Sequence, residues 1–257
     1  MNKVAMGKAV LALVLVLSIS SASADSFSQD FLAVEDNWVD GSEVAYNTVQ
    51  GSGGTSDVIW FRAAGNQEFT RKPYMKFDLS DVVQAAQDNP DANAWAKLSL
   101  TYVSGTSNQR VRLWVLKAGY EAVDGGLGYD WTEDQITWAN APGNDVTNPS
   151  ALTSAFRFLH QDVILDTTTM VAGDKIEVDL NLGKLGGLEE YLQEDNTITI
   201  ALTSFFTSSS VHWASRENQE YDGPTLKVAY EVPEPGTLVL LGTGLVGLIS
   251  SRRRRTA

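Results

Sequence analysis

The segment AKLSLTY, residues 96–102, alternates apolar and polar side chains with a period of two. Successive side chains of a β-strand point to opposite faces of the sheet, so the pattern predicts a strand with one buried and one exposed face. The segment KIEVDL, residues 175–180, repeats it with charged residues on the polar side. Strands with one dry and one wet face are typical of the antiparallel sheets of a β-sandwich.

The same alternation recurs along most of the chain, and helical patterns are rare. We expect further strands at residues 33–39, 57–62, 74–79, 109–116, 196–202, 210–214 and 225–230. Short helices are expected at residues 80–85 and 185–192. Charge and composition show no internal boundary, so residues 25–231 are predicted to form one all-β domain, with residues 25–29 and 232–236 as tethers.

Composition narrows the function classes. The 257 residues include no cysteine, which excludes thiol catalysis, cysteine-type zinc sites and iron–sulfur clusters. Lys3, Lys8 and four terminal arginines are six of the 19 basic residues, and no acidic residue lies at these ends. Residues 25–235 therefore hold 13 basic and 32 acidic residues, a net charge of −19. Such a field repels nucleic acids and anionic membranes, so we expect no nucleic-acid partner.

The first 24 residues have the pattern of a secretory signal peptide. Basic residues precede an apolar run at residues 9–19, and the small residues Ala22-Ser23-Ala24 follow. We expect cleavage between Ala24 and Asp25. The alternative is a membrane-spanning helix, for which the apolar run is short of the ~20 residues required.

The C-terminus carries a second targeting pattern, which occupies residues 232–257. The motif Pro233-Glu234-Pro235 precedes an apolar stretch at residues 237–249, and the basic tail Arg252, Arg253, Arg254 and Arg255 follows. An apolar segment followed by arginines is a stop-transfer signal with the arginines on the cytoplasmic side. This end resembles the PEP-CTERM sorting signal; the alternative is an ordinary membrane anchor.

The resemblance implies a particular route through the cell. It implies a protein of a Gram-negative-type bacterium, held in the inner membrane by a C-terminal hydrophobic helix until an exosortase-type enzyme processes it. The protein would then pass to the cell surface or the extracellular matrix.

Four stretches resemble a second known family. They are DNWVD at 36–40, RKPYMKFDLS at 71–80, WTEDQITWANAP at 131–142 and ASRE at 214–217. In this order they resemble DNRLRE-type modules, grouped as family-96 carbohydrate-binding modules. The resemblance implies a jelly-roll-like antiparallel β-sandwich in an extracellular setting and a polysaccharide ligand, with polyuronates bound by some members. At a net charge of −19, a polyuronate would require clustered basic residues or bridging calcium.

Two groups of residues are candidates for glycan binding. The first comprises the basic residues Arg62, Arg71, Lys76 and Arg216, with Lys72 as a further candidate for the basic cluster; the alternative role of these residues is to pair with carboxylates such as Asp78 and Glu217. Alternation places Lys76 on the outer face with Tyr74 and Asp78. The second comprises Trp114 with Arg110 and Arg112, because an exposed tryptophan can stack on a sugar ring. The alternative is that a loop covers Trp114, and we expect Trp131 and Trp138 to hold a long loop onto the sandwich.

Evidence for metal binding and catalysis is thinner. Asp36, Asp40, Asp124 and Asp130 could supply oxygen ligands to a structural calcium; the alternative is that they are solvated loop carboxylates. His160 and His212 lie in no catalytic motif, and no catalytic residue is predicted. The leading hypothesis is an exported, non-catalytic glycan-binding protein. A structural matrix protein without a ligand and a polysaccharide-degrading enzyme are the alternatives.

Overall fold

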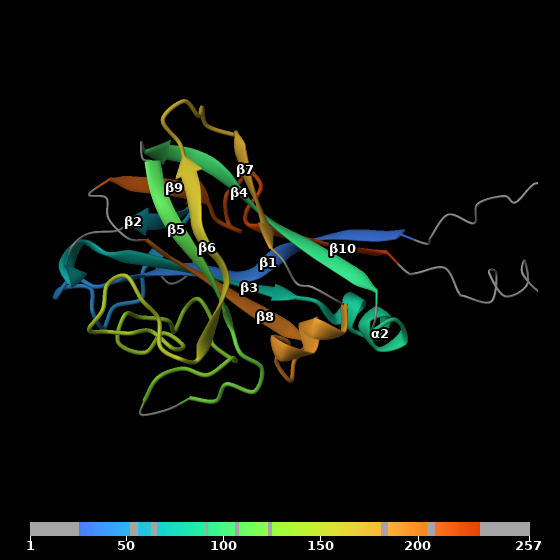
Figure 1. Cartoon of the computed structure of the whole chain (residues 1–257). Coiled ribbons are helices and arrows are strands. Elements are labelled where there is room, and N and C mark those ends of the chain that lie inside the picture. Colours follow the sequence, from blue (N-terminus) through green and yellow to red (C-terminus); the bar gives the residue numbers. More distant parts are fainter. Residues whose placement is uncertain are drawn as a thin grey trace, which may run out of the picture. The chain divides into compact units, whose positions relative to one another are not determined.

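The computed structural model describes residues 26–51, 56–62, 66–90, 92–105, 108–122, 125–180, 185–204 and 209–231 (Figure 1). The signal cleavage site at Ala24 and Asp25 lies outside these residues, as do the sorting motif, the apolar stretch and the basic tail predicted after residue 231. Residues Asp25–Pro233 form one compact unit, and the following description concerns that unit.

The described part of the unit consists mainly of strands. They are β1 (Ser26–Asp40), β2 (Val58–Arg62), β3 (Arg71–Asp78), β4 (Asn93–Gly105), β5 (Asn108–Leu116), β6 (Phe156–Asp166), β7 (Lys175–Leu180), β8 (Thr197–Ser204), β9 (Ser210–Ala214) and β10 (Thr225–Glu231). The helical elements are the 3₁₀ turns η1 (Gln67–Phe69) and η2 (Leu185–Glu190) and the helix α2 (Ser80–Asp88).

The strands form two antiparallel layers. The long strands β1 and β4 take part in both of them. One layer has the order β1-β10-β4-β7. The other has the order β1-β3-β8-β5-β6. Strand β9 pairs with β2 and with the last residues of β4, and Arg62 of β2 pairs with Arg71 of β3. The predicted all-β antiparallel sandwich is confirmed.

Strand predictions from alternation agree with the structure at all nine segments, but two stretches were missed. Residues 26–29, expected to be a tether, pair with β10 from Ser26 opposite Glu231 to Gln29 opposite Val228. The prediction was wrong because the polar Gln29 interrupts the row of apolar side chains that face inward. Strand β6 was missed because register shifts opposite Val111 and Leu113 break its alternation.

Among the described residues, buried apolar side chains gather in two cores. The first lies between the layers and contains Met75, Phe77 and Leu79. The second lies on the opposite face of β3, β8 and β5, where the segment from residue 117 to 155 covers Tyr74 and Ala201. Alternation therefore assigns the two faces of β3 correctly, but the face predicted to be wet is covered by a loop.

Two tryptophans and a lysine hold this covering loop in place. The Trp131 Nε1–H donates to Thr199 Oγ1 at 3.0 Å, and Trp138 is fully buried in the second core. The Lys72 ammonium lies within 2.8–3.2 Å of four oxygens of the loop, from Asn144, Asp145, Asn148 and Ala151. The same ammonium lies 4.5 Å from the centre of the Trp138 ring. The predicted role of Trp131 and Trp138 as anchors of a long loop is confirmed.

Candidate functional site

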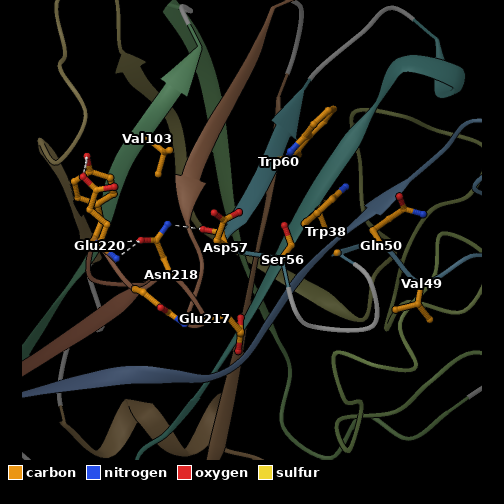
Figure 2. Close-up of a pocket in the computed structure, with 13 residues that line it drawn as sticks. Trp38, Val49, Gln50, Ser56, Asp57, Trp60, Val103, Glu217, Asn218 and Glu220 are labelled. Atoms are coloured by element: carbon orange, nitrogen blue, oxygen red, sulfur yellow. Dashed lines mark hydrogen bonds between the residues drawn. The ribbon is translucent and has the colours of Figure 1, made fainter.

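An open groove of about 1050 Å³ lies where the end of β1, strand β2 and the loop before β10 meet (Figure 2). Trp38 and Trp60 contribute aromatic surface to its wall. Polar groups come from Gln50, Asp57 and residues 217–221. The groove therefore combines apolar ring surface with many hydrogen-bonding groups, which is the usual composition of a ligand site.

Backbone-directed hydrogen bonds fix the loop that forms one side of the groove. The Asn218 side-chain amide donates to the backbone carbonyl of Asp57 at 2.7 Å. Its oxygen accepts from the backbone N–H groups of Glu220 and Tyr221 at 2.9 and 2.7 Å. The Asn218 side chain thus bonds both to its own loop and to Asp57, the residue before β2. Because it joins the two segments, Asn218 sets the position of the groove's polar side (Figure 2).

A stack of three rings supports the aromatic side of the groove. The Trp38 and Trp60 rings are nearly parallel, with an interplanar angle of 10° and centroids 6.1 Å apart. Trp60 also stacks on His212 at 4.6 Å, and Nδ1 of His212 lies 2.7 Å from Ser104 Oγ. Burial lowers the pKa of His212, which favours the neutral ring. Trp60 is thus a half-buried, oriented ring between Trp38 and His212, and the part of the indole that these neighbours leave uncovered forms groove wall that can pack against the C–H groups of a sugar.

The charges in the groove have one sign. The lining carries the carboxylates of Asp57, Glu217 and Glu220, and among the described residues that line it there is no lysine or arginine. Carboxylates accept hydrogen bonds from hydroxyl groups, whereas they repel other carboxylates. The groove is therefore suited to an uncharged, hydroxyl-rich ligand better than to a polyuronate.

A buried carboxyl anchors the base of the groove loop. Asp36 of β1 accepts the backbone N–H of Arg216 at 2.7 Å. Burial raises the pKa of Asp36 to about 8, and the nearby carboxylates of Glu217 and Glu133 act in the same direction. The Arg216 guanidinium binds Glu217 at 2.6 Å and Glu133 at 2.7 Å, so it links the groove loop to the covering loop.

The structure overturns the exposed platform predicted at Trp114. Its ring is only 6% exposed, stacks on Phe158 at 3.7 Å and donates through Nε1 to Thr203 Oγ1. Arg112 lies over the Phe158 ring at 5.3 Å, and Arg110 lies two residues before it on the same strand. Trp114 does belong to the face opposite the inter-layer core, but this face is closed by the covering loop and Phe158.

Lys76 is also covered, contrary to the prediction of an outer-face position open to a ligand. Its ammonium donates to the backbone carbonyl of Trp131 and lies 5.0 Å from the centre of the Trp131 ring. Burial lowers the pKa of Lys76. The reason for the error is the same as for Trp114, because period-two alternation assigns a face and does not say what covers it.

The remaining basic candidates are engaged with neighbours; Arg62 and Arg71 lie opposite each other on paired strands, and Arg216 lies in the groove loop. Arg71 binds Asp40 at 2.7 Å, and Arg62, opposite it on β2, lies over the Phe69 ring at 5.1 Å. Arg216 pairs with Glu217, which was the alternative role considered for it. None of the seven predicted glycan-binding residues lines the groove.

The predicted calcium ligands do not converge in the described residues. Asp36 accepts the Arg216 N–H and Asp40 binds Arg71, while Asp130 lies in the covering loop and Asp124 lies outside the described residues. Within the described ranges, no group of three or more histidines and carboxylates is arranged to hold a metal ion. A calcium site remains a prediction.

The groove residues were not singled out from the sequence. The described lining residues come from separate stretches of the chain, at residue 38, at 49–51, at 56, 57 and 60, at 103 and at 217–221, so no local motif contains the groove. One signal was available, since alternation in β2 places Trp60 on the face opposite Ile59 and Phe61. A tryptophan on the less buried face of a strand, between Val58 and Arg62, indicated either a binding site or a second packing contact.

Comparison with known proteins supports the targeting signal. The model of the PEP-CTERM protein-sorting motif matches residues 231–255, which confirms the resemblance at this end and indicates export and sorting to the bacterial envelope or surface. Among curated proteins, none matches the sequence significantly. The assignment to DNRLRE-type modules therefore remains a resemblance.

Solved structures also match this chain, and one of them serves as an example. It is the native structure of a family 35 carbohydrate binding module from Clostridium thermocellum, at 12% identity and a TM-score of 0.24, covering 79% of this chain and 97% of that one. A TM-score this low transfers no ligand.

In the part of the chain that the structure describes, no helix is long and apolar enough to cross a membrane, and the hydrophobic helix expected at residues 237–249 lies outside that part.

Proposed function

We propose that the protein is an exported, non-catalytic glycan-binding protein of the bacterial envelope or extracellular matrix. It binds a neutral exopolysaccharide in the groove formed by Trp38, Trp60 and residues 217–221, and an exosortase-type enzyme processes its C-terminus. The observation that carries the proposal is the composition of the groove, in which an oriented tryptophan faces carboxylates and amides without a lysine or arginine among the described lining residues.

The chemistry of a sugar accounts for each part of this lining. The C–H face of a pyranose ring packs on an indole, and its hydroxyl groups donate to carboxylates and accept from amides. Trp60 supplies the indole, Asp57 and Glu220 supply acceptors, and Gln50 and Gln219 supply amides. The resemblance to DNRLRE-type modules and the sorting motif support a setting rich in polysaccharide.

Affinity electrophoresis tests the proposal. The full chain, in a non-ionic detergent, migrates through native gels that contain a neutral β-glucan, dextran, alginate or no polymer, each with calcium or with a chelator. We expect retardation in a neutral polymer, none in alginate, and an unchanged chain length of the polymer afterwards. Equal migration in every gel would favour a structural matrix protein without a ligand.

The groove carboxylates give the enzymatic alternative one specific basis. A glycosidase employs two carboxyl groups on either side of the scissile bond, and the groove offers Asp57, Glu217 and Glu220. However, Glu217 is held by the Arg216 guanidinium at 2.6 Å, so one of these three carboxyl groups already has a structural partner. New reducing ends after incubation with the bound polymer would replace the proposal by this alternative.

A further inference from the structure

The two ends of the described domain lie side by side at one end of the fold. Ser26, the first residue of β1, pairs with Glu231, the last residue of β10. Glu231 also pairs with Asn93, the first residue of β4. Figure 1 shows the start of β1 next to the end of β10. The sorting motif begins two residues after Glu231, so any attachment through the C-terminus acts at this end.

The groove lies near the other end of the same strands. Trp38 follows Ser26 by 12 positions in β1, and Val103 follows Asn93 by ten positions in β4. At a rise of ~3.3 Å per residue, these positions correspond to ~40 Å and ~33 Å along the strands. The loop of residues 217–221 enters β10 at Thr225, which is the end opposite Glu231. All three strands thus run from the chain ends toward the groove, which places the groove near the opposite end of the domain.

We propose that the domain has an attachment end, defined by Ser26, Asn93 and Glu231, and a binding end that carries the groove. A chain attached through its C-terminus presents the groove away from the attachment surface, so it can bind polysaccharide that arrives from outside. This inference rests on the proposed glycan binding. It adds that the bound polymer is one on the far side of the domain from the attachment surface. The attachment surface lies next to Glu231, whereas the groove lies near the opposite end of the domain.

The absence of native cysteine allows a direct test. A single cysteine at Asn93, in Asn93→Cys, marks the attachment end. A single cysteine at Val44, in Val44→Cys, marks the binding end, since Val44 is 93% exposed and lies between β1 and the lining residue Val49. Each full-length variant is coupled in detergent through a short thiol linker to a planar surface at equal density, and capture of a fluorescent neutral β-glucan is measured.

We expect the Asn93-coupled protein to bind the glucan within about twofold of the affinity in solution, and the Val44-coupled protein to capture at least tenfold less. Both variants, with the thiol blocked, must bind like wild type in solution, which shows that neither substitution alters the groove. Equal capture by both surfaces, or better capture through Val44, overturns the orientation and leaves glycan binding intact. If wild type fails to bind the glucan in solution, glycan binding at the groove fails and the orientation falls with it.

Discussion

Replacement of Asp36 by asparagine should stabilise the protein at neutral pH and change the pH dependence of its stability. Asp36 is buried, and its carboxyl accepts the N–H of Arg216 at 2.7 Å. Burial raises the pKa of Asp36 from 3.8 to about 8, so the folded protein holds the carboxyl protonated at neutral pH while the unfolded chain ionises it. Asparagine keeps an acceptor oxygen for Arg216 and carries no titrating group.

The magnitude follows from proton linkage. Because the pKa of Asp36 is raised in the folded state, its contribution to stability is full below pH 3.8 and is lost as the pH rises through about 8. Between these values folding takes up one proton, which costs about 1.4 kcal/mol per pH unit. Relative to wild type, Asp36→Asn should therefore gain about 3 kcal/mol in the free energy of unfolding between pH 5 and pH 7.

Urea unfolding of both proteins at pH 5, 6 and 7, followed by tryptophan fluorescence, measures this difference. Most of the other titrating groups occur in both proteins, so their contributions largely cancel. Asp40→Asn is the matched control, because Asp40 is also buried on β1 but faces Arg71 at 2.7 Å. The control should lose stability throughout the range. A difference between Asp36→Asn and wild type that is constant with pH, or that grows toward acid, would refute the reasoning.

Three other perturbations have defined outcomes. Trp60→Ala should weaken glucan binding by about 10- to 100-fold in affinity gels, as expected for loss of ~1.5–3 kcal/mol of stacking, whereas Trp95→Ala, 40% exposed and outside the groove, should leave it unchanged. Lys72→Met should lower the free energy of unfolding by about 3 kcal/mol and expose residues 143–152 to proteases, because four loop oxygens lose their hydrogen-bond donor. Unchanged stability and unchanged cleavage would contradict the role of Lys72 in holding the covering loop. Chelation should shift the melting temperature by less than 2 °C, and a larger drop would establish the predicted calcium.

The strands were predictable because a sandwich imposes the same rule on each of them. In β7, Val178 and Leu180 face the core while Lys175, Glu177 and Asp179 face water, so the pattern and the structure coincide. The rule fails where a bulge shifts the register, as in β6, and where a polar residue occupies an inward position, as at Gln29. Both failures are local exceptions to period two, and neither changes the fold class.

The covering loop explains why the prediction of the binding site was wrong although the prediction of the fold was correct. A face of a sheet that is polar in sequence is normally exposed, and Lys72, Lys76 and Arg112 gave the face of β3 and β5 that character. In the structure the two lysines hold the loop, since Lys72 binds its oxygens and Lys76 binds the Trp131 carbonyl, while Arg112 lies over the Phe158 ring. Basic residues on this face therefore indicate a buried contact with loop carbonyls, which a sequence pattern cannot distinguish from a site for an anionic ligand.

The same arrangement bears on the sign of the ligand's charge. The basic residues that would neutralise a polyuronate are engaged elsewhere, as Arg71 is with Asp40 and Arg216 is with two glutamates. The groove itself retains its carboxylates, and within a net charge of −19 it holds a negative potential that salt screens but does not reverse. Binding to such a surface must come from ring stacking and hydroxyl hydrogen bonds. Added salt should therefore weaken the repulsion between the groove and alginate, whereas binding of a neutral glucan should hardly change with salt.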